Sequence, residues 1–193
     1  MSAIRAGGVL VVAATKAEAA HVPPGTELLI TGIGKVRAAS AVARRLALGD
    51  YGRVVNIGTS GALRDGRVGL FTPSRVVEHD ISAVELAAMG YHQPDEWEIP
   101  DGDGSVLATG DMFVTDAVHR ARLAQRADLV DMEGAAVVAV CAEFGVPVRL
   151  VKVVSDNADE ESFDWPSVID AAARQLGEWL AATGFGEQVS LAR

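Results

Sequence analysis

The chain has 193 residues, of which 49% are hydrophobic and 22% are charged. This length favours one domain, residues 1–193, with a single sizeable core, because domains average roughly 150 residues. The formal net charge is −9, from 26 acidic and 17 basic residues. It argues against nucleic acid or an anionic membrane as a partner, since either would require a basic patch on the protein.

The cysteine and histidine contents exclude further classes of protein. The single cysteine, Cys141, cannot form an internal disulfide, and no basic start followed by a long apolar stretch marks a signal peptide or a transmembrane helix. We therefore expect a cytoplasmic protein. The four histidines lie far apart without paired spacing, so we predict no metal site.

Short apolar runs alternate with amphipathic segments along the chain. This alternation predicts a single-domain α/β fold, in which helices flank a central mixed, twisted and partly closed sheet. The polar, acidic segment 91–104 is expected to be a mobile loop near the ligand. The expected strands are 8–13, 26–31, 54–57, 74–78, 105–109 and 148–154, and the expected helices are 35–48, 82–89, 115–126, a central one from about 131 to 144, and one from about 166.

Two glycine-rich segments match well-known motifs incompletely. Gly32-Ile33-Gly34-Lys35 begins like the dinucleotide fingerprint G-x-G-x-x-G, but Arg37 occupies the third glycine position. We therefore predict no NAD or FAD, and no other cofactor. Gly58-Thr59-Ser60-Gly61 begins like the G-x-S-x-G elbow of serine hydrolases, but Ala62 replaces the last glycine, which argues against acyl transfer.

Carboxylates gather at both ends of one unit of the chain. Asp131 and Glu133 stand at the start of the central helix, and Ser155 and Asp156 follow the strand that comes after it. Glu18 likewise lies beyond the first expected strand. Because open α/β sheets bind their ligands at the carboxyl ends of the strands, these positions predict a binding site.

Five motifs follow one another along the chain: Thr31-Gly32-Ile33-Gly34-Lys35-Val36, Asn56-Ile57-Gly58-Thr59-Ser60-Gly61-Ala62-Leu63, Thr109-Gly110-Asp111-Met112-Phe113-Val114, Met132-Glu133-Gly134-Ala135-Ala136 and Val154-Ser155-Asp156-Asn157-Ala158-Asp159. In this order they resemble the nucleoside phosphorylase and nucleosidase superfamily. Within it, the chain is most similar to the bacterial nucleosidases that hydrolyse 5'-methylthioadenosine and S-adenosylhomocysteine, and to the futalosine hydrolases. The resemblance implies an N-glycosidase that acts on a purine nucleoside.

The resemblance also implies roles for individual residues. Asp156 would protonate or hydrogen-bond the purine at N7, Glu133 would bind the ribose hydroxyls, and Glu18 would activate the attacking water. Phe113 would stack on the base and Met132 would pack beneath the ribose. The other substrate-binding candidates are Thr59, Ser60, Gly61, Val114, Ser155 and Lys152, the last as a support for Glu18 or Ser155.

Three functions stay open from the sequence: hydrolysis of a purine nucleoside, its phosphorolysis, and binding without catalysis. The presence of Glu18, Glu133 and Asp156 together argues against the last. The segment 13–18 lacks the glycine-rich turn with which phosphorylases of the superfamily hold phosphate, and Glu18 would repel a phosphate dianion, although Lys16, Lys35 or Arg37 could attract one. We therefore predict hydrolysis, and the resemblance further implies a homodimer.

Overall fold

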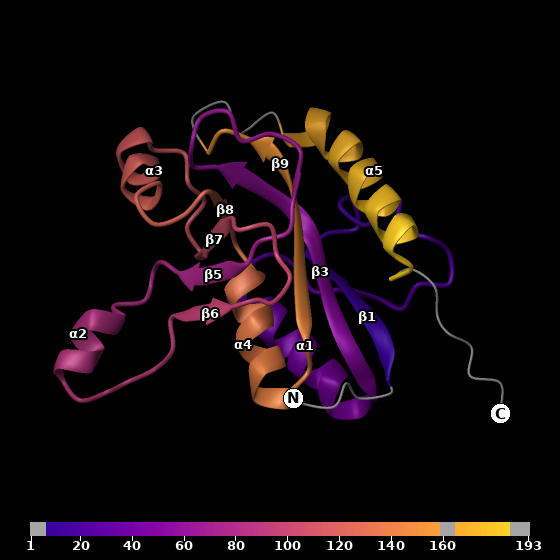
Figure 1. Cartoon of the computed structure of the whole chain (residues 1–193), viewed down its shortest axis with the longest axis horizontal. Helices are drawn as coiled ribbons and strands as arrows, with labels where there is room; N and C mark the ends of the chain where they lie inside the picture. The colour runs from indigo at the N-terminus through magenta and orange to yellow at the C-terminus, as the bar shows by residue number, and fades with distance from the viewer. Residues whose placement is uncertain (1–6, 159–164, 186–193) are drawn as a thin grey trace.

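A computed structural model of the protein describes residues 7–158 and 165–185 (Figure 1). The strands are β1 (Gly8–Ala13), β2 (Leu28–Ile30), β3 (Tyr51–Ala62), β4 (Leu70–Phe71), β5 (Arg75–Glu78), β6 (Glu96–Glu98), β7 (Val106–Thr109), β8 (Leu129–Asp131) and β9 (Val148–Asp156). The helices are α1 (Lys35–Leu48), α2 (Ala83–Ala88), α3 (Ala117–Leu123), α4 (Gly134–Phe144) and α5 (Trp165–Thr183). The fold is α/β, as predicted.

The long strand β3 organises the sheet. One of its edges pairs in parallel with β9 from Val54 to Gly61, while its other edge pairs first with β1 and then, at Gly61 and Ala62, with β8 in antiparallel orientation. The main path runs β2-β1-β3-β8-β7-β5-β6, and β9 carries β4 on its far side. The sheet is therefore mixed, as predicted.

The predicted partial closure is wrong, because the sheet is open. The two ends of the main path, β2 and β6, do not pair with each other. Since β1 and β8 share one edge of β3 in succession, the sheet branches at the end of β3 instead of curling into a ring.

Helices cover both faces of the sheet (Figure 1). On one face, α1 and α4 pack together, with Val42 and Leu46 meeting Val137 and Cys141 over β1 and β3. Alanine, valine and leucine at positions 38, 42 and 46 form the buried stripe of α1, one residue per turn. On the other face, Leu176 and other apolar residues of α5 pack on β3 and β9.

Three local expectations differ from the structure. Strand β3 covers twelve residues, because its glycines and polar side chains at 58–61 obtain ladder partners in β9. Asp131 ends strand β8, and the helix begins only at Gly134. The expected loop 91–104 contains β6, which pairs with β5.

Within the described ranges, no helix is both long and apolar enough to cross a bilayer.

Candidate active site

A cavity of about 380 Å³ lies where the carboxyl ends of β1, β3, β8 and β9 converge. The converging strand ends of an α/β sheet are the usual place for a ligand. Of the residues predicted for the site, all but Lys152 line this cavity: Glu18, Thr59, Ser60, Gly61, Phe113, Val114, Met132, Glu133, Ser155 and Asp156.

Glu18 is held firmly in the turn that follows β1, with only 5% of its surface exposed. One carboxylate oxygen accepts hydrogen bonds from the amide and hydroxyl of Thr15, at 3.0 and 2.9 Å. The other accepts from the amide and hydroxyl of Thr59 on β3, at 2.9 and 3.0 Å. These four bonds fix the carboxylate between two strand ends, at the wall of the cavity.

Glu133 occupies the position before α4 and is 8% exposed. Its Oε1 accepts a hydrogen bond of 2.8 Å from the amide of Gly34, at the start of α1. Burial raises the pKa of Glu133 to about 7, and the nearby carboxylate of Asp131 adds to this rise, while Lys152 and the Gly34 amide oppose it. Near neutral pH, Glu133 can therefore change its protonation state.

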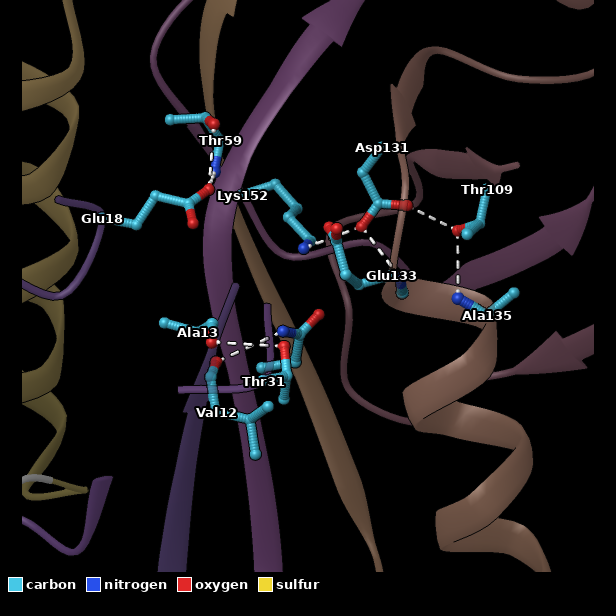
Figure 2. Close-up of polar contacts among 12 residues, drawn as sticks. Val12, Ala13, Glu18, Thr31, Thr59, Thr109, Asp131, Glu133, Ala135 and Lys152 are labelled. Atoms are coloured by element: carbon cyan, nitrogen blue, oxygen red, sulfur yellow. Dashed lines mark hydrogen bonds and ion pairs between the residues drawn. The ribbon is translucent and has the colours of Figure 1, made fainter. Parts of the chain in front are cut away.

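A buried polar network lies behind Glu133 (Figure 2). The ammonium of Lys152 lies 2.8 Å from Oδ2 of Asp131, and the other oxygen of Asp131 accepts a hydrogen bond of 2.5 Å from the hydroxyl of Thr109. Asp131 and Thr109 also accept hydrogen bonds from the amides of Gly134 and Ala135, the first two of α4. They thus satisfy amide donors that a helix leaves unpaired at its start.

Lys152 is therefore placed differently from the other predicted site residues. It is 1% exposed, does not line the cavity, and contacts neither Ser155 nor Glu18 by any hydrogen bond or ion pair identified in the described residues. Burial lowers the pKa of Lys152, but Asp131 and Glu133 outweigh that effect and raise it above its ordinary value. The side chain is a buried cation.

Asp156 ends β9 and lines the cavity. Its two oxygens accept hydrogen bonds from the hydroxyl of Ser155, at 2.7 Å, and from the amide of Ala158, at 2.8 Å. Gly61 lets this segment approach closely, since a Cβ at residue 61 would lie 3.0 Å from Oδ1 of Asp156 and 2.9 Å from Cβ of Ala158. The glycine is needed for the shape of the wall.

Apolar side chains form the rim of the cavity. Phe113 is 48% exposed, and Met112 and Ile33 beside it are exposed to a similar extent. Val114, by contrast, is buried in the core below. Carboxylates on separate segments thus face a cavity with an apolar rim, an arrangement that can hold a flat ligand and transfer protons at both of its ends.

Several residues of this region were missed in the sequence. Asp131 was noted beside Glu133 but was given no role, Thr109 and Gly34 lie within two of the motifs but were not assigned to the site, and Thr15 carried no visible signal. Their contribution depends on contacts between distant segments, such as the bond from Gly34 to Glu133. No residue of the segment 91–104 lines the cavity, and no group of three or more potential ligands in the described part of the chain could hold a metal ion.

The chain is similar to proteins of known function. Residues 103–183 match the model of the phosphorylase superfamily. The chain is 32% identical over 171 residues to a 5'-methylthioadenosine/S-adenosylhomocysteine nucleosidase of Shewanella halifaxensis, covering 72% of each chain. It is 31% identical over 159 residues to the aminodeoxyfutalosine nucleosidase of Helicobacter pylori, covering 68% of each.

The fold is also similar to that of a solved structure. The superposition on a variant of the Helicobacter pylori nucleosidase, with 5'-methylthioadenosine in its active site, has a TM-score of 0.83 at 20% sequence identity. It covers 92% of this chain and 98% of the other. At this identity the likeness concerns the fold.

Proposed function

Since the chain belongs to the 5'-methylthioadenosine/S-adenosylhomocysteine nucleosidase family of the phosphorylase superfamily, we propose that it hydrolyses the N-glycosidic bond of such a purine nucleoside. The observation that carries the proposal is the placement of Glu18, Glu133 and Asp156 on separate walls of one cavity. The products are the free base and the ribose sugar.

Asp156 acts on the leaving base. As the C1'–N9 bond breaks, its electrons pass to the purine, and Asp156 delivers a proton or a hydrogen bond to N7. The hydroxyl of Ser155 and the amide of Ala158 orient the carboxyl group. Phe113, on the rim, offers a face on which the purine stacks.

Glu133 and Glu18 act on the sugar and on the water. The carboxylate of Glu133 accepts hydrogen bonds from the ribose hydroxyls, and these bonds strengthen as positive charge develops on the sugar. Met132 packs against the ribose. Glu18, fixed by Thr15 and Thr59, takes a proton from the water that attacks C1', so the proton balance of the hydrolysis is complete.

The lining of the cavity favours water over phosphate as the acceptor. No lysine or arginine lines the cavity within the ranges that the structure describes. The ammonium of Lys35, which the sequence left as a possible phosphate ligand, is bound to Glu78 and Asp80 at 2.6 and 2.5 Å. A phosphate dianion beside Glu18 would therefore meet no lysine or arginine of the cavity lining that could offset the repulsion.

The apolar rim supports a second part of the proposal, a homodimer. Ile33, Met112 and Phe113 are exposed next to the cavity, and Val36, the second residue of α1, is exposed as well. Exposed apolar side chains in such a cluster are typical of an interaction surface. A cytoplasmic location fits the single cysteine, which is buried and free.

Product analysis tests the reaction. The protein is incubated with 5'-methylthioadenosine, S-adenosylhomocysteine, aminodeoxyfutalosine and adenosine, each with and without phosphate, and the base and sugar products are measured. Free sugar should accumulate at the same rate in both buffers. A phosphate-dependent rate that yields ribose 1-phosphate would identify a phosphorylase, and the absence of base release from every nucleoside would contradict the proposal.

A matched pair of substitutions tests the role of Asp156. Asp156→Asn should lower turnover about 10²- to 10⁴-fold, the usual contribution of a general acid, because the amide keeps the shape but cannot deliver a proton. Asp170→Asn, the same change at an exposed residue of α5, should leave turnover unchanged. Wild-type turnover by Asp156→Asn would remove Asp156 from its role.

A further inference from the structure

The buried ammonium of Lys152 has more hydrogen-bonding capacity than its surroundings use. A lysine ammonium carries three donors, and the contact identified for this one in the described residues is Oδ2 of Asp131, at 2.8 Å. Its side chain is the bulkiest among the fully buried ones. Besides this ion pair, the negative charges of Glu133 and Glu18 also act on the ammonium and raise its pKa.

Gly58 keeps the space open between Lys152 and Glu18. Lys152 and Gly58 are paired residues on the neighbouring strands β9 and β3. A Cβ at residue 58 would lie 3.1 Å from Oε1 of Glu18 and 3.4 Å from Nζ of Lys152. The absent side chain therefore leaves the ammonium and the Glu18 carboxylate facing the same small space, on the inner side of the cavity wall.

Asp131 holds the other side of the arrangement. It receives the ammonium of Lys152, the hydroxyl of Thr109 and the amide of Gly134, so its two oxygens are fully engaged. Figure 2 shows Glu133 beside this contact, with Lys152 reaching across from β9. The position of the ammonium relative to Glu133 is therefore fixed by a carboxylate that belongs to β8.

The charged groups around Glu133 come from every segment packed against it. Asp131 on β8 and Glu18 in the turn after β1 are negative and favour the protonated acid. Lys152 on β9 is positive and favours the carboxylate, with help from the amide of Gly34 before α1. Lys152 is thus the cation that partly opposes two carboxylates and the burial of Glu133 itself.

We propose that Lys152 and Asp131 form a positioning pair in which Lys152 favours the carboxylate form of Glu133 from behind the cavity wall and Asp131 fixes the ammonium in place. The inference rests on the proposed function, in which the Glu133 carboxylate binds the ribose hydroxyls. Neither residue of the pair touches the reacting atoms. Their action on the sugar passes through the charge of Glu133, and a nucleoside with its ribose hydroxyls intact is the ligand that requires it.

Substitutions at the two positions should shift the acid limb of the pH profile of kcat/KM, the range in which activity rises with pH as Glu133 ionises, in opposite directions. In Lys152→Met the loss of the cation should shift this limb upward by about 1–3 pH units, so activity at pH 7 falls at least about fivefold and recovers at higher pH. In Asp131→Asn the loss of a neighbouring negative charge should shift the limb downward. A defect of packing would lower activity equally at all pH values.

Two control variants guard the result. Lys152→Arg keeps the positive charge, so its acid limb should lie at the same pH as that of the wild type. Arg174→Met removes an exposed cation on α5 and should leave the acid limb unchanged. If Lys152→Met alone does not fold, Lys152→Met with Asp131→Asn removes both charges of the pair. In this double variant the limb should lie above that of Asp131→Asn alone, because the same cation is lost from the same background.

A measurement without turnover separates this inference from the function. The carboxyl carbon of Glu133, labelled with ¹³C and assigned with Glu133→Gln, reports its titration directly by NMR. If the titration of Glu133 shifts upward in Lys152→Met and downward in Asp131→Asn but no nucleoside is hydrolysed, the proposed function is contradicted and the positioning pair is supported. If hydrolysis occurs but neither the limb nor the titration of Glu133 moves in Lys152→Met, the positioning pair is overturned.

Discussion

The molecule contains two lysine-centred clusters of similar composition and different surroundings. Lys152 lies with Asp131 and Glu133 in the interior, where the side chains of the ion pair are at most 2% exposed. Lys35, at the start of α1, binds Glu78 and Asp80 near the surface, where the three side chains are 19–24% exposed. Both clusters join one ammonium to two carboxylates from other segments.

One carboxylate of each cluster, Asp80 near the surface and Glu133 in the interior, shifts its pKa in the opposite direction to the other. At Asp80, burial raises the pKa, but the hydrogen bonds from Lys35 and from the amide of Asp111 outweigh it, so the pKa is lowered. At Glu133, burial is the largest cause, and the pKa rises despite the nearby cation. The comparison teaches that one lysine, with an amide, lowers the pKa of Asp80 where water still reaches the cluster, but does not prevent burial from raising the pKa of Glu133 in the interior.

The largest expected effect is on stability when the buried cluster is broken. Lys152→Met leaves the carboxylate of Asp131 buried without its cation, so the free energy of unfolding should fall by about 3–5 kcal/mol. Urea titrations at neutral pH measure this. Adding Asp131→Leu to the Lys152→Met variant should recover much of the lost stability, because the ion pair is then removed as a whole. A loss below about 1 kcal/mol in Lys152→Met alone would remove the contrast with the surface cluster.

The pH dependence of stability should sharpen the comparison next. Glu133 has a pKa of about 7 in the folded protein against an ordinary value of 4.5, so the folded state holds its proton more tightly. The stability from this group is therefore complete below about pH 4.5 and is lost as the pH rises to about 7. The loss is on the order of 3 kcal/mol, since a tenfold change in proton affinity is worth about 1.4 kcal/mol.

Glu133→Gln tests that expectation. Urea midpoints between pH 4.5 and 8 should fall with pH more steeply in the wild type than in this variant, which lacks the titrating group. Parallel curves for the two proteins would mean that Glu133 titrates near its ordinary value, and that the interior of the site is better hydrated than its burial indicates.

Breaking the surface cluster should cost less. Lys35→Met removes a partly exposed cation whose partners can be solvated, so the free energy of unfolding should fall by about 1 kcal/mol or less. This loss of stability should shrink further in 1 M salt, where the Debye length is only about 3 Å and exposed charges are strongly screened. The loss of stability in Lys152→Met should stay nearly constant, because its charges are buried. Equal salt sensitivity of the two variants would contradict the assignment of different environments.

The smallest effect sets the baseline for these measurements. Arg174 and Asp170 form an exposed pair one turn apart on α5, at 2.9 Å. Arg174→Met should change the unfolding free energy by at most about 0.5 kcal/mol and leave turnover unchanged, as exposed pairs on a helix usually do. A larger effect would show that α5 contributes to the site through the sheet.

The sequence predicted well those features that depend on neighbouring residues. The apolar runs predicted strands at β1, β7 and β9, and the pattern of α1 predicted that helix with its observed bounds. The strands β4, β6 and β8 were not predicted, because each has only two or three residues and is defined by its pairing partner. Strand β3 was predicted too short because its glycines and hydroxyls carry little local strand signal.

The sequence by itself determined three carboxylates that line the cavity, because Glu133 and Asp156 lie within the family's motifs and Glu18 follows the first strand, at a position that the resemblance indicates. Only the tertiary structure decided which charged groups lie near each of these carboxylates. Lys152 is 21 residues from Asp131 along the chain, yet β8 and β9 bring them together behind the cavity. Burial, and the electrostatics that follow from it, depend on the whole packed molecule, so no local pattern contains them.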